Sequence, residues 1–316
     1  MSNMDSRFYF ALPAICVLLF LAAPVCGSAI NTEDPVKDRL RSVRTGPARD
    51  LPWKPLVRSR PRVIYGHDDR MDVYQTDNMR LQVDAASTCA LVSSADITDN
   101  GDETWTIQLS TYVNPDTGNP PCDGEPFADQ PTAAFCTGWL AGDYLIATAG
   151  HCYNSADLVD TWFVFGFHML NVTTPVMVVD DSQVYRGIEM VSTNPSGDRD
   201  HSVVRVDRFV EAVNARPMRI SRVGGSQSST FPAGSRAGVM GHPAGLPLKV
   251  AFGNSTVVLV NDPSLPYFQA NLDTYGGNSG SPVFNVFLGI VEGVLVKGAM
   301  DYIDDGTCFV SNVLPD

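Results

Sequence analysis

The feature that most constrains the fold is a recurrence of short β-branched and aromatic runs, each bounded by clusters of Gly, Pro, Asn and Asp. Such runs cover residues 162–167, 175–179, 202–206, 255–260, 267–272, 291–296 and 308–313. Runs of this length between turn residues are typical of strands, whereas few stretches have the period of a long amphipathic helix. Many short strands favour a sandwich or barrel over a parallel α/β sheet. We therefore expect an all-β fold.

The N-terminus has the layout of a secretory signal peptide. Residues 8–23 are apolar apart from Pro13, and small residues follow at 27–29. An uncleaved anchor helix is the alternative, but Pro13 and Pro24 keep the apolar run shorter than the ~20 residues that span a bilayer. We expect residues 1–29 to be removed on export, which leaves an extracellular protein without a membrane partner.

Residues 30–62 differ in charge from the rest of the chain. They hold nine Arg and Lys against four Asp and Glu, a net charge of +5. Residues 1–29 carry no net charge and the whole chain carries −13, so residues 63–316 carry −18. So acidic a body repels phosphate backbones, and we expect no nucleic-acid partner. The basic stretch predicts a cleavable pro-segment. It ends in Arg58-Ser59-Arg60-Pro61-Arg62, which indicates processing after Arg62 and a mature terminus at Val63.

Cysteine spacing predicts a disulfide beside a histidine. Five cysteines lie beyond the predicted signal peptide: Cys89, Cys122, Cys136, Cys152 and Cys308. Export favours disulfides, and an odd number leaves at least one cysteine unpaired within the chain. Cys152 follows His151 directly, so a disulfide to Cys136 would fix the loop that carries this imidazole. We expect that pair, and we also expect Cys122 to pair with Cys308 while Cys89 stays free.

A second candidate site lies at residues 273–282, Asp-Thr-Tyr-Gly-Gly-Asn-Ser-Gly-Ser-Pro. Glycines on both sides of Ser279 let the backbone turn so that the N–H groups of Gly277 and Ser279 can converge on an oxyanion. An ordinary turn is the alternative, but a turn would not require this order of residues 128 positions after His151. Ser281 stands where the Gly-x-Ser-x-Gly elbow of α/β-hydrolases needs a glycine, which disfavours that fold.

A catalytic histidine also needs an acid that holds its tautomer and stabilises the imidazolium. Asp200 lies at the start of an alternating run between the two motifs, and Asp198 and Asp207 are the alternatives. We expect Asp200 to be this acid. The remaining histidines show neither His-Glu-x-x-His nor paired Cys-x-x-Cys spacing, so we expect no metal and no cofactor.

These segments resemble the trypsin-like serine peptidases, and more narrowly the branch of bacterial glutamyl endopeptidases. The resemblance covers residues 63–316 and rests on Val63-Ile64 with Asp68-Asp69-Arg70, on Thr148-Ala149-Gly150-His151-Cys152, and on the run 273–282. It implies two packed antiparallel β-barrels, at residues 63–208 and 209–316, with the active site between them.

The resemblance also implies a function. His151 would be the general base, Asp200 its orienting acid and Ser279 the nucleophile of a secreted endopeptidase that cleaves a protein or peptide substrate through an acyl-enzyme. An inactive homologue that serves as a binding module and an esterase that uses the same triad are the alternatives. Because Asn278 stands where digestive relatives carry an acid for the new N-terminal amine, we expect that terminus to pack near the specificity pocket, or processing to remove a blocking pro-segment. The oligomeric state stays open.

The resemblance gives two conflicting indications of substrate preference. Asp273 lies six residues before Ser279, where digestive trypsin-like enzymes receive an Arg or Lys side chain, although an Asp-Thr pair can be structural in the glutamyl branch. That branch's specificity histidine falls at Leu295, which offers a substrate carboxylate no partner. We rank basic side chains first, small or apolar ones next and Glu last. The candidate substrate-binding residues are Asp273, Thr274, Leu295 and Gly298.

Overall fold

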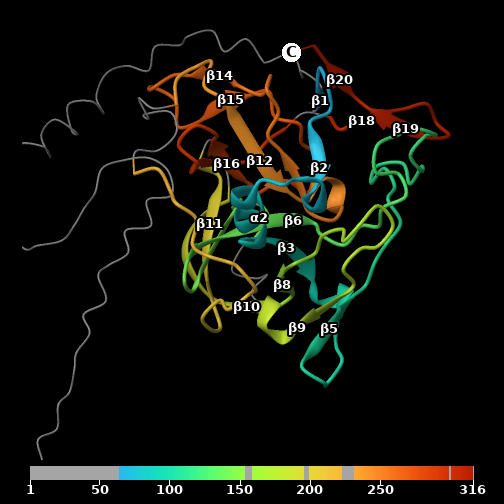
Figure 1. Cartoon of the computed structure of the whole chain (residues 1–316), viewed down its shortest axis with the longest axis vertical. Coiled ribbons are helices and arrows are strands. Elements are labelled where there is room, and N and C mark those ends of the chain that lie inside the picture. The colour runs from blue at the N-terminus through green and yellow to red at the C-terminus, as the bar shows by residue number, and fades with distance from the viewer. Residues whose placement is uncertain (1–63, 154–158, 196–198, 223–230, 299, 316) are drawn as a thin grey trace, which may run out of the picture.

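The computed structural model describes residues 64–315 except 154–158, 196–198, 223–230 and 299 (Figure 1). The predicted signal peptide, the predicted pro-segment and Val63 therefore lie outside the described residues. Within the part that is described, no helix combines the length and the apolar character needed to cross a membrane.

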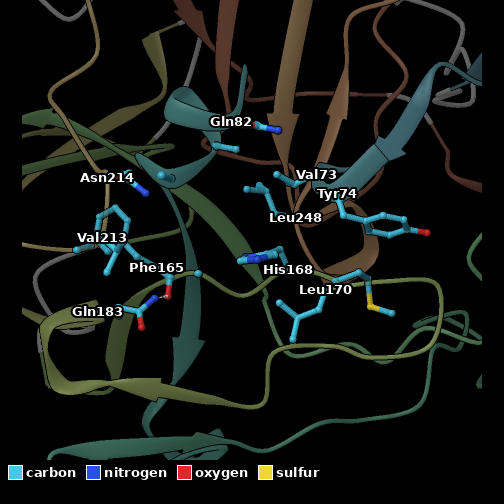
Figure 2. Close-up of a pocket in the computed structure, with 15 residues that line it drawn as sticks. Val73, Tyr74, Gln82, Phe165, His168, Leu170, Gln183, Val213, Asn214 and Leu248 are labelled. Carbon is cyan, nitrogen blue, oxygen red and sulfur yellow. Dashed lines mark hydrogen bonds between the residues drawn. The ribbon is translucent and has the colours of Figure 1, made fainter. Parts of the chain in front are cut away.

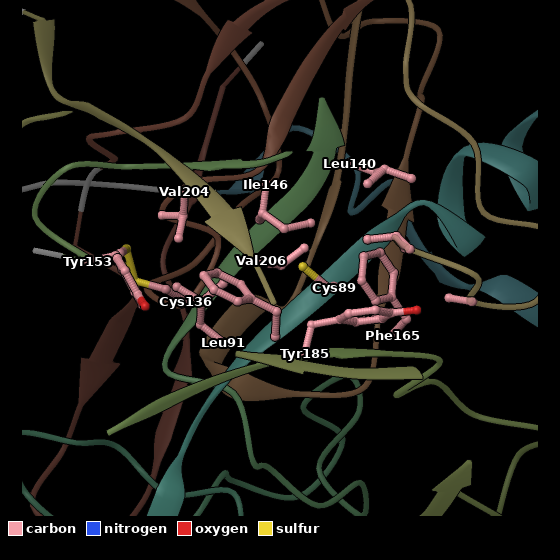
Figure 3. Packing of buried hydrophobic residues seen from close by; sticks show 14 of the residues in the cluster. Cys89, Leu91, Cys136, Leu140, Ile146, Tyr153, Phe165, Tyr185, Val204 and Val206 are labelled. Atoms are coloured by element: carbon pink, nitrogen blue, oxygen red, sulfur yellow. A yellow bond between two sulfur atoms is a disulfide. The ribbon is translucent and has the colours of Figure 1, made fainter. Parts of the chain in front are cut away.

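Six antiparallel strands form a closed barrel in the order β10-β11-β7-β6-β3-β8. Their bounds are β3 (Thr88–Ser93), β6 (Cys136–Gly142), β7 (Leu145–Thr148), β8 (Thr161–Phe165), β10 (Val184–Asn194) and β11 (His201–Val206). Alternation along β3 shows why the strand is buried throughout. Cys89 and Leu91 pack with Phe165 and Val204 in one cluster (Figure 3), whereas Ala90 and its neighbour Val92 pack in another.

A second antiparallel sheet has the order β17-β16-β12-β13-β2 and lies beside the barrel (Figure 1). Its strands are β2 (Arg70–Asp72), β12 (Ala237–Gly241), β13 (Lys249–Ala251), β16 (Pro282–Asn285) and β17 (Ile290–Val294). The architecture confirms the expected all-β fold of the two-barrel, trypsin-like class. The boundary between residues 208 and 209 stays a prediction. The strand β2 comes from the N-terminal half of the sequence but pairs with β13 in the sheet of the C-terminal half.

A buried ion pair attaches β2 to this sheet. Asp72 and Lys249 are register partners on β2 and β13, and Lys249 Nζ lies 2.7 Å from Asp72 Oδ1. The same ammonium donates to Gln130 Oε1 and to the Pro247 carbonyl, each at 2.7 Å. All three donors of the buried ammonium are therefore satisfied, as burial of a charge requires.

Smaller elements complete the described chain. They are β1 (Ile64–Tyr65) with β20 (Val313–Leu314), β4 (Ile97–Asp99) with β5 (Thr104–Ile107) and β9 (Val178–Asp180), β14 (Val258–Asn261) with β15 (Phe268–Ala270), β18 (Tyr302–Asp304) with β19 (Phe309–Ser311), and the helix α2 (Met79–Ala86). Sequence analysis did not predict α2. Asn78 caps it by accepting from the N–H groups of Arg80 and Leu81.

Both expected disulfides are present, Cys136–Cys152 and Cys122–Cys308. Cys89 is free and fully buried among apolar side chains. The second disulfide ties the loop around Cys122 to β19, where the Cys122 N–H also donates to the Phe309 carbonyl at 2.8 Å.

Candidate active site

Strand pairing brings His151 and Asp200 together. Thr148 on β7 pairs with Ser202 on β11, so the residues that follow β7 and precede β11 meet at one end of the barrel. His151 Nδ1 lies 2.6 Å from Asp200 Oδ2, and the His151 backbone N–H donates to Oδ1 at 2.9 Å. The Asp200 side chain is 6% exposed and the imidazole 40%, so one ring edge is fixed and the other is open. This geometry lets the carboxylate orient the imidazole.

The alternative acids do not share this geometry. Asp207 Oδ1 accepts the Arg186 N–H at 3.3 Å, and its Oδ2 lies 3.2 Å from Arg208. Asp198 lies outside the described residues.

The Cys136–Cys152 disulfide joins the His151 loop to the start of β6, and both ends of this link contact the serine loop. Cys152 Sγ lies 3.6 Å from the Ser279 carbonyl oxygen, a van der Waals contact because the bonded sulfur has no proton. The next residue after Cys136, Thr137, donates its N–H to that same carbonyl at 2.9 Å. No hydrogen bond joins Ser279 Oγ to His151 among the described residues; the two are linked through this disulfide and the start of β6.

Cys136, His151 and Cys152 also form a cluster whose ligand-type atoms lie within 4.8 Å of one another. Both sulfurs are consumed by the disulfide, so they are not thiolates and the cluster cannot bind a metal in this form.

Two glycines give the serine loop its shape. Gly277 and Gly280 have φ values of +88° and +93°, and a Cβ at Gly280 would lie 2.0 Å from the Thr137 carbonyl oxygen. A Cβ at Gly277 would lie 2.4 Å from the His242 carbonyl oxygen. Both positions therefore require glycine.

The hydrogen bonds of this loop leave a pair of donors free. The N–H groups of Asn278, Gly280 and Ser281 bond to the carbonyls of Tyr275, Leu295 and Asn278 at 3.0, 2.7 and 2.9 Å. The N–H groups of Gly277 and Ser279 have no acceptor among the described residues. These are the two donors that the sequence predicts for an oxyanion hole.

Thr137 supports the serine loop, and the sequence analysis did not single it out. Its hydroxyl donates to the Gly277 carbonyl at 2.9 Å and accepts the His242 N–H at 2.9 Å. Thr148 Oγ1 in turn donates to the Thr137 carbonyl at 2.7 Å. The sequence offered one signal for this contact. Thr137 directly follows Cys136, so a disulfide to Cys152 also holds Thr137 close to the His151 loop.

Asp273 is buried against the N-terminal segment. Its two oxygens accept the N–H groups of Tyr65 at 2.8 Å and of Asp69 at 2.7 Å, and the residue is 2% exposed. Burial raises the pKa of this carboxyl to about 6. The predicted role in receiving a basic side chain stays a prediction, and the geometry favours the structural alternative because both oxygens already accept backbone N–H groups and the residue is buried.

The other candidate substrate-binding residues differ in burial. Thr274 is buried and Gly298 is exposed. The Leu295 side chain packs against a buried apolar cluster that includes Phe231 and Leu272. Its backbone links directly to the serine loop, donating its N–H to the Ser281 carbonyl at 2.9 Å.

A cavity of about 360 Å³ lies elsewhere, between α2, β8 and the loop around Val213 (Figure 2). His168 and Gln183 contribute polar groups to a mainly apolar lining, and burial lowers the pKa of His168. Its described lining includes none of His151, Asp200 and Ser279, so this cavity is not the candidate active site.

Comparison with known proteins agrees with the motifs. The model of the trypsin-like peptidase domain matches residues 136–294, half of the chain. The structure is similar to that of the VesB protease of Vibrio cholerae, with 16% sequence identity and a TM-score of 0.45 over 78% of this chain and 63% of that one. The chain thus spans less than two thirds of that solved chain. No curated protein matches the sequence. Because the matched half contains the histidine, aspartate and serine motifs, the chain belongs to the family of trypsin-like peptidase domains.

Proposed function

We propose that this chain is the precursor of a secreted serine endopeptidase in which His151, Asp200 and Ser279 form the catalytic triad. The observation that carries the proposal is the 2.6 Å contact between His151 Nδ1 and Asp200 Oδ2, in a loop clamped against Ser279. The N–H groups of Gly277 and Ser279 support it further, because neither has an acceptor among the described residues and both residues are only partly buried, so both donors are available to an oxyanion.

The mechanism follows from these groups. Asp200 accepts a hydrogen bond from His151 Nδ1–H, which keeps the proton on Nδ1 and leaves Nε2 as the base that takes the Ser279 hydroxyl proton. The alkoxide attacks the scissile carbonyl, and the N–H groups of Gly277 and Ser279 bind the resulting oxyanion. His151 then protonates the leaving amine, and water hydrolyses the acyl-enzyme by the same steps in reverse order. No cofactor is needed.

Processing after Arg62 would place the mature terminus next to a fixed strand. Ile64 is buried, and β1 pairs in parallel with β20 through Ile64 and Val313. A terminus at Val63 would precede that strand directly. Sequencing the N-terminus of the active secreted protein tests this step, and an active form that retains residues 30–62 would contradict it.

A peptide library tests the activity itself. The processed protein should cleave internal peptide bonds, and Ser279→Ala should cleave none. An esterase would turn over esters while leaving every peptide intact, whereas a binding module would hydrolyse neither class. The library also ranks the side chains accepted at the scissile position.

A further inference from the structure

We propose that Asp301 is a positioning residue for the oxyanion hole. It holds Gly276 so that the N–H of Gly277 faces the reaction centre. This inference rests on the proposed function, since it assigns the support of the same site. Asp301 lies in the segment that leads into β18, outside every motif of the sequence analysis.

Gly276 is held from two sides. Its N–H donates to Asp301 Oδ2 at 2.7 Å, and its carbonyl accepts the Ala244 N–H at 2.5 Å. The C=O and N–H of one trans peptide point in opposite directions. Because the Gly276 carbonyl points to Ala244, the N–H of Gly277 in the same peptide points away from Ala244. Two hydrogen bonds to one residue therefore set the direction of an oxyanion-hole donor.

The Ala244 side of this clamp is a rigid turn. Ala244 has φ +55° within the short 3-10 turn Pro243–Gly245, and the Gly245 N–H bonds back to the His242 carbonyl at 3.0 Å. That carbonyl is the atom that a Cβ on Gly277 would meet at 2.4 Å. The turn therefore packs directly against the backbone of Gly276 and Gly277.

The Asp301 side is the exposed side of the clamp. Gly276 itself is exposed, so without Asp301 water would compete for its N–H. The Asp301 backbone is fixed, since its carbonyl accepts the Asn312 N–H at 3.0 Å and the next residue, Tyr302, is buried in the cluster that also contains Tyr275. A carboxylate on such an anchor makes a short, charge-assisted bond to a backbone N–H.

The same segment offers a matched control. Asp304 also accepts hydrogen bonds from a distant loop, from the Nδ2 groups of Asn114 and Asn119 at 2.9 Å each. No hydrogen bond joins Asp304 to the serine loop among the described residues. Removing its carboxylate should disturb the loop around residues 114–119 without reaching Gly276.

The test compares wild type with Asp301→Ala, Asp301→Asn and Asp304→Ala in the processed full chain. Active sites are titrated with a fluorophosphonate, so that kcat is expressed per reactive serine and unfolded protein is not counted. Deleting a direct oxyanion-hole donor lowers kcat about 10²–10³-fold. Losing a residue that only positions such a donor should lower kcat by a smaller factor. We therefore expect Asp301→Ala to lower kcat ~10–100-fold with KM within about twofold of wild type. If that variant does not fold, Asp301→Leu, which has a similar shape but no acceptor, should give the same loss.

The conservative variant separates a hydrogen bond from a charge. Asn keeps an acceptor oxygen, so Asp301→Asn should restore kcat to within about threefold of wild type, and Asp304→Ala should leave kcat unchanged. Normal kcat in Asp301→Ala, an Asn variant as impaired as the Ala variant, or equal losses at Asp301 and Asp304 would each overturn the proposal. A wild-type protein with neither hydrolysis nor labelling would instead defeat the proposed function, and this inference with it.

Discussion

The carboxylate of Asp273 accepts the backbone N–H of Tyr65 at 2.8 Å, across 208 residues of sequence. The second oxygen accepts the Asp69 N–H at 2.7 Å. Because Asp273 begins the run that ends in the serine loop, these bonds attach the first described residues of the chain to the candidate active site. The acid that sequence analogy offers to a substrate is therefore occupied by the protein's own backbone.

Asp273 should make stability depend on pH. Its pKa is raised from 3.8 to about 6 by burial, so the folded protein binds this proton more tightly than the unfolded chain does. The stabilisation is fully present below about pH 4 and is lost as the pH rises through about 6. The free energy of unfolding of wild type minus that of Asp273→Asn should fall by ~2–3 kcal/mol from about pH 4 to about pH 7. Denaturant unfolding at several pH values measures it, and a flat or rising difference would contradict the account.

The same variant should leave the substrate preference unchanged. Asp273 is buried and both of its oxygens bond to the protein's own backbone, so the ratio of cleavage after Arg or Lys to cleavage after other residues should be equal in wild type and Asp273→Asn. A peptide library run on both proteins gives this ratio. Selective loss of Arg and Lys cleavage in the variant would restore the basic-pocket role.

The buried ion pair of Lys249 and Asp72 should contribute far more to the free energy of unfolding than an exposed ion pair does. Both side chains are 2–3% exposed, so Lys249→Ala leaves an unpaired carboxylate in the interior. We expect a loss of about 3–5 kcal/mol in unfolding free energy. Arg205→Ala is the control, because Arg205 lies 2.8 Å from Glu189 on the surface and should contribute at most about 1 kcal/mol. Similar losses in the two variants would show that burial does not set the value of this pair.

The fold class and the triad motifs were accessible from the sequence because both depend on local signals. The run at residues 202–206 falls within β11, and the run at 162–167 overlaps β8, since β-branched and aromatic residues mark strands wherever one face is buried. The helix α2 was missed because eight residues are too few to show a helical period, although its cap Asn78 was a usable signal.

Long-range partners were not accessible. Nothing local to Asp273 indicates that its acceptors face Tyr65, and nothing local to Asp301 indicates a bond to Gly276. Such contacts depend on how distant segments pack, which composition and spacing do not encode. The same holds for Leu295, whose packing against the buried cluster of Phe231 and Leu272 has no local signal in the sequence.

Asp200 should be essential to turnover but not to folding. Asparagine in its place can still accept the His151 backbone N–H but presents the wrong partner to Nδ1. The same change in an established triad lowers kcat about 10⁴-fold. Steady-state kinetics of Asp200→Asn, with Asp198→Asn as the matched control, measures this loss. Near-normal activity in the first variant with collapse in the second would identify Asp198 as the acid.

The most direct measurement of the central claim is the site of covalent labelling by a fluorophosphonate. The reagent reacts with a serine only when a neighbouring base activates it, so the processed protein should carry one adduct, located on Ser279 by peptide mass spectrometry. His151→Ala should label slowly or not at all, although the serine is intact. No adduct on folded, processed protein, or an adduct on a different residue, would contradict the assignment of Ser279 as the nucleophile.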